Sequence, residues 1–196
     1  MSEMLFIRHA ETDMADTFCG HSDPELNARG LMQLAALIDK LRIKKIGVIY
    51  TSNLRRALAT GRAIADAFGV DCHVRPALRE IGFGRWEGLT WDEIEERDEA
   101  YARRWATEFP GLPAPEGECF QDFERRVLEE VRFLSTKECD DRCAAIVTHA
   151  GVLRTVLRTF HGCSEEDAWR QTRSHCCIVS HNSEVCSSSQ TAEVQL

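Results

Sequence analysis

The sequence has no long hydrophobic run. No apolar stretch approaches the roughly 20 residues needed to cross a bilayer, although 43% of the 196 residues are hydrophobic. The first residues also lack a basic segment followed by an apolar core and a cleavage site, the pattern typical of a secretion signal. We therefore expect a protein of the cytoplasm that neither spans nor binds a membrane.

Basic blocks and a positive overall charge are also absent. The formal net charge is -8, from 24 Lys and Arg against 32 Asp and Glu, which argues against nucleic acid or anionic membrane as a partner. Any local cluster of arginines is then informative, because overall basicity does not explain it. Repeats and linkers are missing as well, and only Ser183–Gln190 is Ser-rich and polar. We predict one domain spanning 1–196.

Cys-x-x-Cys pairs are missing, although the chain has nine cysteines. An odd number of cysteines without an export signal indicates a reducing compartment rather than a disulfide framework. The densest group of metal-type side chains comprises His161, Cys163, His175, Cys176, Cys177 and His181. Its spacing differs from that of common zinc sites, which favours buried thiols packing as small hydrophobes. We expect neither a metal nor a cofactor.

Short apolar runs alternate with segments of helical periodicity along the chain. Strands are predicted at 4–7, 46–50, 72–75 and 144–148, with one or two more in 176–195. Helices are predicted at 28–42, 54–68, 90–109, 120–134 and 152–161, with Ser164 capping a further one and Ser52 or Asn53 capping the second. This alternation predicts a three-layer α/β/α sandwich with a largely parallel central sheet.

Polar side chains with useful chemistry follow these strands. Loops at the carboxyl ends of parallel strands converge, which places His9, Glu80 and His149 in one crevice. Histidine is suited to act as a neutral nucleophile near pH 7, and a carboxyl such as Glu80 can donate a proton. Arg8 and Arg56 supply planar donor forks for phosphate oxygens. These groups suffice to move a phosphoryl group without a metal.

The motifs that carry these residues resemble, in order, those of the histidine phosphatase superfamily, which has the phosphoglycerate-mutase-like fold. They cover about 1–160 of the chain and comprise Phe6-Ile7-Arg8-His9-Ala10-Glu11-Thr12, Phe18–Asp23, Leu26–Gly30, Thr51–Ala57, Glu80–Gly88, Pro115–Glu118 and Val147–Gly151. A single one of these motifs would be weak evidence, whereas the ordered series is specific.

The resemblance implies a two-step hydrolysis of a small-molecule phosphomonoester. His9 would attack phosphorus and carry a phosphohistidine. Arg8, Arg56 and His149 would bind the phosphoryl oxygens. Glu80 would protonate the leaving alcohol and then activate the water that clears the intermediate.

The sequence departs from the family pattern at four positions. Ala10 and Ala150 stand where the family has glycine, and we expect a methyl at either place to crowd the phosphate pocket. Ala15 and Thr17 replace an asparagine and an arginine that contact phosphate or substrate in the mutases. Their loss favours hydrolysis over phosphoglycerate mutase activity.

Within the superfamily, the segments most similar to α-ribazole phosphatases of cobalamin assembly are Phe18–His21, Phe83–Glu87, Tyr101–Trp105 and Gly117–Gln121. This similarity implies α-ribazole 5′-phosphate as the substrate. Alternatives are a sugar phosphate, fructose 2,6-bisphosphate or a broad set of monoesters, and a non-catalytic phosphate-binding module. The Trp- and Phe-bearing helices either cover the pocket or form a homodimer face.

Other polar and aromatic residues near these motifs are given structural interpretations. Arg55 is expected on the surface beside an inward-facing Arg56. Glu11 and Glu87 are expected to be structural or solvated. His21 is expected at the mouth of the crevice and Trp86 in a packing role, and His73 and His161 are expected to be ordinary polar positions.

Overall fold

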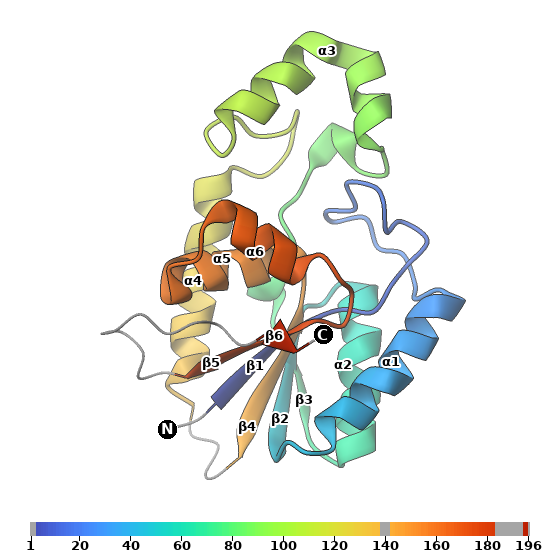
Figure 1. Cartoon of the computed structure of the whole chain (residues 1–196), viewed down its shortest axis with the longest axis vertical. Helices are drawn as coiled ribbons and strands as arrows, with labels where there is room; N and C mark the ends of the chain where they lie inside the picture. Colours follow the sequence, from blue (N-terminus) through green and yellow to red (C-terminus); the bar gives the residue numbers. More distant parts are fainter. Residues whose placement is uncertain (1–2, 138–141, 183–193, 196) are drawn as a thin grey trace.

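A six-stranded sheet forms the centre of the molecule. The computed structural model describes residues 3–137, 142–182 and 194–195. The strand order is β3-β2-β4-β1-β5-β6, and Figure 1 shows the strands side by side. Strands β1 to β4 run parallel and β5 and β6 antiparallel; their bounds are Glu3–Arg8, Ile46–Thr51, Cys72–Val74, Cys143–Thr148, Ile178–Asn182 and Val194–Gln195.

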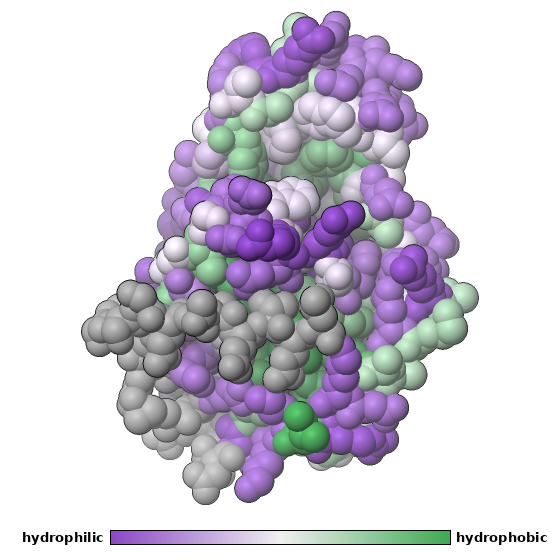
Figure 2. Space-filling view, viewed as in Figure 1, coloured by the Kyte–Doolittle hydropathy of each residue, from purple (hydrophilic) through white to green (hydrophobic). Residues whose placement is uncertain are grey.

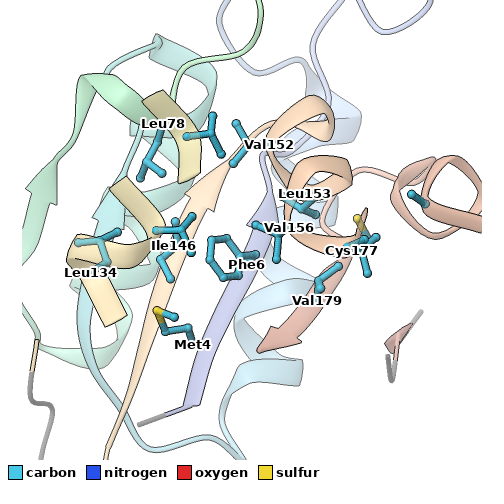
Figure 3. Close-up of a cluster of buried hydrophobic side chains, with 14 of the residues drawn as sticks. Met4, Phe6, Leu78, Leu134, Ile146, Val152, Leu153, Val156, Cys177 and Val179 are labelled. Atoms are coloured by element: carbon cyan, nitrogen blue, oxygen red, sulfur yellow. The ribbon is translucent and has the colours of Figure 1, made fainter. Parts of the chain in front are cut away.

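Helices cover both faces of the sheet, as Figure 1 shows. On one face lie α1 (Ala28–Leu41) and α2 (Arg55–Phe68), and on the other lie α4 (Phe120–Ser135), α5 (Ala150–His161) and α6 (Glu165–Thr172). Successive side chains of β1 point to opposite faces of the sheet and pack against the helices on each face. Met4 and Phe6 pack toward α4 and α5 (Figure 3), whereas Leu5 and Ile7 pack toward α1 and α2. The predicted three-layer sandwich with a largely parallel sheet is confirmed.

Helix α3 (Trp91–Glu108) stands apart from the sheet at one end of the molecule (Figure 1). A reciprocal pair of hydrogen bonds between Thr90 and Glu93 caps it, and Asp98 interrupts its helical geometry. It forms a separate small cluster with Trp86, which is 6% exposed. The packing role expected for Trp86 is therefore confirmed, and the aromatic helix covers the end of the sheet where the parallel strands finish.

Most predicted elements agree with the structure to within two residues, and the exceptions have local causes. Helix α5 begins at Ala150, directly after the strand. The Gly-rich segment 78–88 contains a short 3₁₀ turn at Gly84–Trp86, and another turn lies at Pro76–Leu78. The expected Ser-rich stretch at 183–190 lies outside the described residues.

The cap predicted for α2 is wrong. Its N-cap is Leu54, which makes no side-chain cap bond. Ser52 Oγ accepts from Leu54 N at 3.3 Å, and Asp23 Oδ1 in the preceding loop accepts from Arg55 N at 2.5 Å. Asp23, 32 positions before Arg55 in the sequence, thus accepts from the first amide of α2. The Ser52 hydroxyl can still donate a hydrogen bond to another residue.

Among the described residues, none of the helices is both long and apolar enough to cross a bilayer.

Candidate active site

The carboxyl ends of β1, β2 and β4 meet beneath α3 (Figure 1). His9 directly follows β1, Ser52 follows β2 and His149 follows β4. The register aligns Arg8 of β1 with Thr148 of β4, and the His9 amide donates to Thr148 O at 2.9 Å. The rings of His9 and His149 consequently lie 5.1 Å apart. The sequence prediction that these strand ends converge is correct.

His9 is held by contacts at both ring nitrogens. Its Nδ1 lies 2.7 Å from Ala10 O, and because a carbonyl oxygen only accepts, Nδ1 carries the hydrogen. Nε2 therefore has the lone pair, and it accepts from Arg56 Nε at 3.2 Å. Burial, together with Arg56 and Arg8, lowers the pKa of His9 well below 6.5. The imidazole is thus neutral, as a nucleophile must be.

Arg56 is a fully buried guanidinium, 1% exposed, on the first turn of α2. Besides its bond to His9, it donates from Nη1 to Ser22 O at 2.6 Å and from Nη2 to Gly20 O at 2.8 Å. These bonds tie the loop after β1 to the site. Arg55 beside it faces solvent and pairs with Glu25, so the expected inward and outward orientations are confirmed.

Arg8 is the last residue of β1 and precedes His9. Its Nη1 donates to Thr172 O at 2.9 Å and to Arg173 O at 2.5 Å, at the end of α6. Its Nη2 bonds to His175 Nε2 at 3.1 Å. Within the described part of the chain, the buried Nε finds no partner. An oxyanion placed beside His9 would supply one.

Glu80 enters the same end of the pocket from the segment after Pro76–Leu78. Its Oε1 accepts from the Ile81 amide and its Oε2 from the Gly151 amide, each at 3.0 Å. A Cβ at Gly151 would lie 2.1 Å from Glu80 Oε1. Glycine at position 151 is therefore required for the carboxylate to approach the first turn of α5.

His149 is completely buried at the N-terminus of α5, and its Nε2 lies 2.9 Å from Ser52 Oγ. Its Nδ1 is buried with no partner among the residues described. Burial, and then the charges of Arg56 and His9, lower its pKa well below 6.5. His149 is thus a neutral imidazole with one nitrogen unused, and Ser52, predicted as a helix cap, orients it instead.

Arg8, His9, Arg56 and Glu80 line a cavity of about 1070 Å³, whereas His149 and Ser52 are buried outside its lining. Figure 2 shows the surface hollowed beneath α3, with pale and green residues gathered there. Aromatic rings from five parts of the chain line the remainder: Phe18, Phe83, Trp91, Trp105, Phe109, Phe120, Phe123 and Trp169. The Trp- and Phe-bearing helices, whose place the sequence left open, line this pocket.

Arginines dominate the charged lining of the cavity despite the net charge of -8. Six line it, Arg8, Arg29, Arg56, Arg154, Arg158 and Arg173, against the four acids Glu11, Asp16, Glu80 and Glu165. Such an excess of cations in a partly desolvated cleft attracts an anion. A neutral nucleophile, flanking guanidiniums and a carboxyl group within reach are the groups that phosphoryl transfer needs.

Comparisons with known proteins agree with this chemistry. Residues 4–187 match the family model of the histidine phosphatase superfamily, branch 1. The chain belongs to this superfamily. It is 33% identical over 159 residues to an adenosylcobalamin/alpha-ribazole phosphatase of Salmonella typhimurium, covering 79% of this chain and 77% of that protein. It is 32% identical over 165 residues to a metal-independent phosphoserine phosphatase of Arabidopsis thaliana, covering 80% and 67%.

The fold comparison gives the same result. The crystal structure of the alpha-ribazole phosphatase from Shigella flexneri superposes with a TM-score of 0.79 at 28% identity, covering 91% of this chain and 89% of that one. The chain is accordingly a phosphatase with the α/β fold of its superfamily, and small phosphate compounds are substrates that fit this family.

Several pocket residues of this phosphatase escaped the sequence analysis. Arg154 follows Gly151 by three residues on α5, and its guanidinium stacks 3.4 Å above the Trp169 ring. Burial lowers the pKa of Arg154 to about 10. His175 was considered only within the cysteine-rich group. The signal for Arg154 was its position one helical turn after Gly151, which places it on the same helix face.

The remaining polar predictions have mixed outcomes. Glu87 is structural as expected: Oε1 accepts from the His21 and Phe83 amides, and Oε2 accepts from the Ser22 hydroxyl. His21 bonds to the Glu80 carbonyl at 2.9 Å and supports that segment from outside the pocket lining. Glu11, in contrast, lines the pocket.

The two alanines differ from each other. Ala10 is completely buried and packs in the core cluster of α1 and α2, outside the pocket lining. The expectation that its methyl crowds the phosphate pocket is therefore wrong, because the methyl has a place in the core. Ala150 does line the pocket.

The histidines and cysteines near the C-terminal end separate into different surroundings. Cys177 is 3% exposed and packs in the core on the α5 side. The rings of His161 and His181 pair at 5.3 Å beside Phe160, whereas His175 faces His9. Within residues 3–137, 142–182 and 194–195, no group of three or more His, Cys, Asp or Glu could hold a metal ion.

Proposed function

We propose that this phosphatase hydrolyses phosphomonoesters without a metal, through a phosphohistidine on His9. The observation that carries the proposal is the hydrogen bond from His9 Nδ1 to the Ala10 carbonyl, which leaves the lone pair on Nε2. Arg56 Nε donates to this nitrogen, and Arg8, whose buried Nε has no partner among the described residues, lines the same cavity; both would bind phosphoryl oxygens. Donors fixed in place by other bonds stabilise a transition state without having to reorganise.

In the first step, Nε2 of His9 forms a bond to phosphorus as the bond to the leaving oxygen breaks, and Glu80 gives that oxygen its proton. In the second step, water attacks phosphorus, the P–N bond breaks and the water proton goes to Glu80. With the Ser52 hydroxyl donating to His149 Nε2, Nδ1–H of His149 would be the further donor to a phosphoryl oxygen. The enzyme then returns to its starting protonation state.

We further propose α-ribazole 5′-phosphate as the substrate. Flat aromatic groups stack on aromatic side chains with a gain of about 1–3 kcal/mol per ring, and the rings of α3 and the loop after β1 form such a wall. A cavity of about 1070 Å³ is large for a small leaving group and suits a nucleoside-sized one. The relatives from Salmonella and Shigella bear this activity in their names.

O-phosphoserine is the second candidate. The relative from Arabidopsis is named for it. Arg154 lines the pocket, and its Nε donates to Thr172 Oγ1 at 3.1 Å, so the rest of its guanidinium would suit the carboxylate of an amino acid.

The test is phosphate release, in the presence of a chelator, from α-ribazole 5′-phosphate, O-phosphoserine, 3-phosphoglycerate, fructose 2,6-bisphosphate and p-nitrophenyl phosphate. We expect kcat/KM to be highest for α-ribazole 5′-phosphate and activity to vanish in His9→Ala. Quenching the wild type during turnover should trap an acid-labile phosphoryl group that the variant lacks. Chelator-sensitive turnover, or turnover that survives in His9→Ala, would refute the mechanism.

The preferred substrate is a separate question from the mechanism. A higher kcat/KM for O-phosphoserine than for α-ribazole 5′-phosphate would select the second candidate. Equal and low values across the panel would instead indicate a broad phosphatase. In either case, the His9 mechanism is judged by the variant and the trapping experiment alone.

A further inference from the structure

His175 is a third histidine at the nucleophile, and the mechanism above gives it no part. It lies between α6 and β5, with its side chain 10% exposed, and lines the cavity. Its ring centroid is 5.4 Å from that of His9. Its Nε2 lies 3.1 Å from Nη2 of Arg8. Because arginine only donates, Nε2 of His175 is the acceptor.

The contact with His175 leaves some hydrogen-bond donors of Arg8 for a ligand. A guanidinium has five N–H groups. The two on Nη1 serve the carbonyls of Thr172 and Arg173, and one on Nη2 serves His175. Within the described part of the chain, two donors remain: the buried Nε–H, and the second hydrogen of Nη2, for which only the contact with His175 is found. Adjacent N–H groups of this kind form the parallel fork that binds two oxygens of a phosphate.

The other ring nitrogen of His175 is oriented by Glu11. Since Nε2 accepts, Nδ1 carries the hydrogen, and it lies 3.8 Å from Glu11 Oε2. That distance is too long for a hydrogen bond, so the attraction is electrostatic. Glu11 is itself fixed by Gln33 Nε2 at 3.1 Å and Arg29 Nε at 3.5 Å. The carboxylate therefore favours the tautomer in which Nε2 faces Arg8.

We propose that His175 is a positioning residue for phosphate binding: it holds the Arg8 guanidinium so that Nε–H and one Nη2–H form a fork for the phosphoryl oxygens. The proposal rests on the proposed function and assigns the orientation of its anion clamp to a residue outside the recognised motifs. The carbonyls of Thr172 and Arg173, at the end of α6, hold the Nη1 side of the same guanidinium.

The charges around His175 keep it in the accepting form. Arg8 and Arg29 face it and disfavour a proton on the ring, as does Arg56 farther away, whereas Glu11 favours one. His9 on the adjacent side is neutral. Burial, followed by Arg8, lowers the pKa of His175 to about 4. The ring is thus neutral and accepts from Arg8 at pH 6, and it takes up a proton as the pH falls toward 4.

Two substitutions at His175 distinguish loss of the hydrogen-bond acceptor from loss of the volume that the ring fills. In His175→Gln, the amide oxygen reaches as far as Nε2 and still accepts from Arg8. His175→Met has similar length and no comparable acceptor. We expect Kd for inorganic phosphate, measured by calorimetry, to rise about tenfold in His175→Met and less than about threefold in His175→Gln. KM for p-nitrophenyl phosphate should follow the same order.

The matched control is His73→Met, the same change at an exposed histidine on β3 outside the pocket lining, which should leave Kd unchanged. In an Arg8→Met background, adding His175→Met should change Kd less than twofold, because its effect passes through Arg8. Between pH 6 and pH 4, phosphate affinity of the wild type should fall relative to His175→Gln as the imidazole takes up a proton.

Equal Kd values for His175→Gln and His175→Met would overturn the proposal, as would a full tenfold effect in the Arg8→Met background. Phosphate binding is measured without turnover. A wild type that binds phosphate but hydrolyses nothing would therefore refute the phosphatase mechanism, while the Kd series would still decide the role of His175.

Discussion

Gly151→Ala tests how closely the position of Glu80 is controlled. The added Cβ would lie 2.1 Å from Glu80 Oε1 and 3.2 Å from Phe123 Cζ. Ordinary van der Waals contact begins near 3.4 Å. The carboxylate must therefore withdraw by about 1.3 Å, which also lengthens or breaks its bond to the Gly151 amide.

The expected loss follows from this displacement. A misplacement of about 1 Å in a catalytic group costs on the order of 100-fold in rate, or about 2.7 kcal/mol of transition-state stabilisation. General acid catalysis as a whole contributes about 10²- to 10⁴-fold. We expect kcat for an alkyl phosphate to fall about 100-fold, with little change in Kd for inorganic phosphate, because Arg8 and Arg56 are untouched.

The assay compares leaving groups. An alkoxide needs its proton as it departs, whereas p-nitrophenolate does not, so Gly151→Ala should slow alkyl phosphate hydrolysis more than p-nitrophenyl phosphate hydrolysis. In a Glu80→Ala background there is no carboxylate to displace, and adding Gly151→Ala should have almost no further effect. Equal losses for both substrates, or additive effects in the double variant, would refute the assignment of Glu80 as proton donor.

Three further outcomes follow from the structure. Because burial and the neighbouring arginines lower the pKa of His9, the acid limb of kcat/KM should lie below pH 6.5; a limb at or above 6.5 would contradict a neutral His9. Trp105→Ala should raise KM for α-ribazole 5′-phosphate about tenfold by removing a stacking surface, with no change for O-phosphoserine. The pKa of His181 is lowered to about 4 in the folded state, against 6.5 in the unfolded chain. Below pH 6.5 the unfolded chain therefore binds a proton that the folded protein does not, and the free energy of unfolding falls by about 1.4 kcal/mol per pH unit down to pH 4. In urea unfolding, His181→Leu should therefore weaken the decline in stability between pH 6.5 and 4; an unchanged decline would exclude His181 as its source.

The positions of Arg8, His9, Arg56 and His149 followed from the sequence because each lies in or beside an element that periodicity identifies, whereas Glu80 lies in the Gly-rich segment after the turn Pro76–Leu78. His9 and His149 directly follow buried parallel strands, and parallel strands place their carboxyl ends together. Arg56 occupies the first turn of α2, and a one-residue difference in helical register separates it from exposed Arg55. Local pattern and one topological rule were sufficient for these residues.

Residues whose roles depend on distant contacts could not be found this way. Asp23 caps α2 from 32 residues away, and His175 meets Arg8 across 167 residues. Only the tertiary fold reveals such pairs, since neither partner has a distinctive neighbourhood in the sequence. Ser52 illustrates the same limit: its type and position suggested a helix cap, but the approach of β4 gives it His149 as a partner.

Ala10 provides a test of whether a departure from the family pattern affects the site or the core. Its methyl packs among the residues between the sheet and α1 and α2, and its amide donates to Thr60 Oγ1 at 3.2 Å. Ala10→Gly should therefore cost about 1–2 kcal/mol of unfolding free energy, from the lost methyl burial and the greater freedom of the unfolded chain.

The catalytic consequence of Ala10→Gly should be small, with kcat/KM for p-nitrophenyl phosphate within about twofold of wild type, because the residue is outside the pocket lining. Urea unfolding and steady-state kinetics on the same preparation check both expectations. Ala150→Gly is the paired variant, since Ala150 lines the pocket. A large gain in kcat/KM for Ala10→Gly without loss of stability would contradict this interpretation. It would mean that the methyl of Ala10 constrains His9 and that its burial in the core does not stabilise the fold.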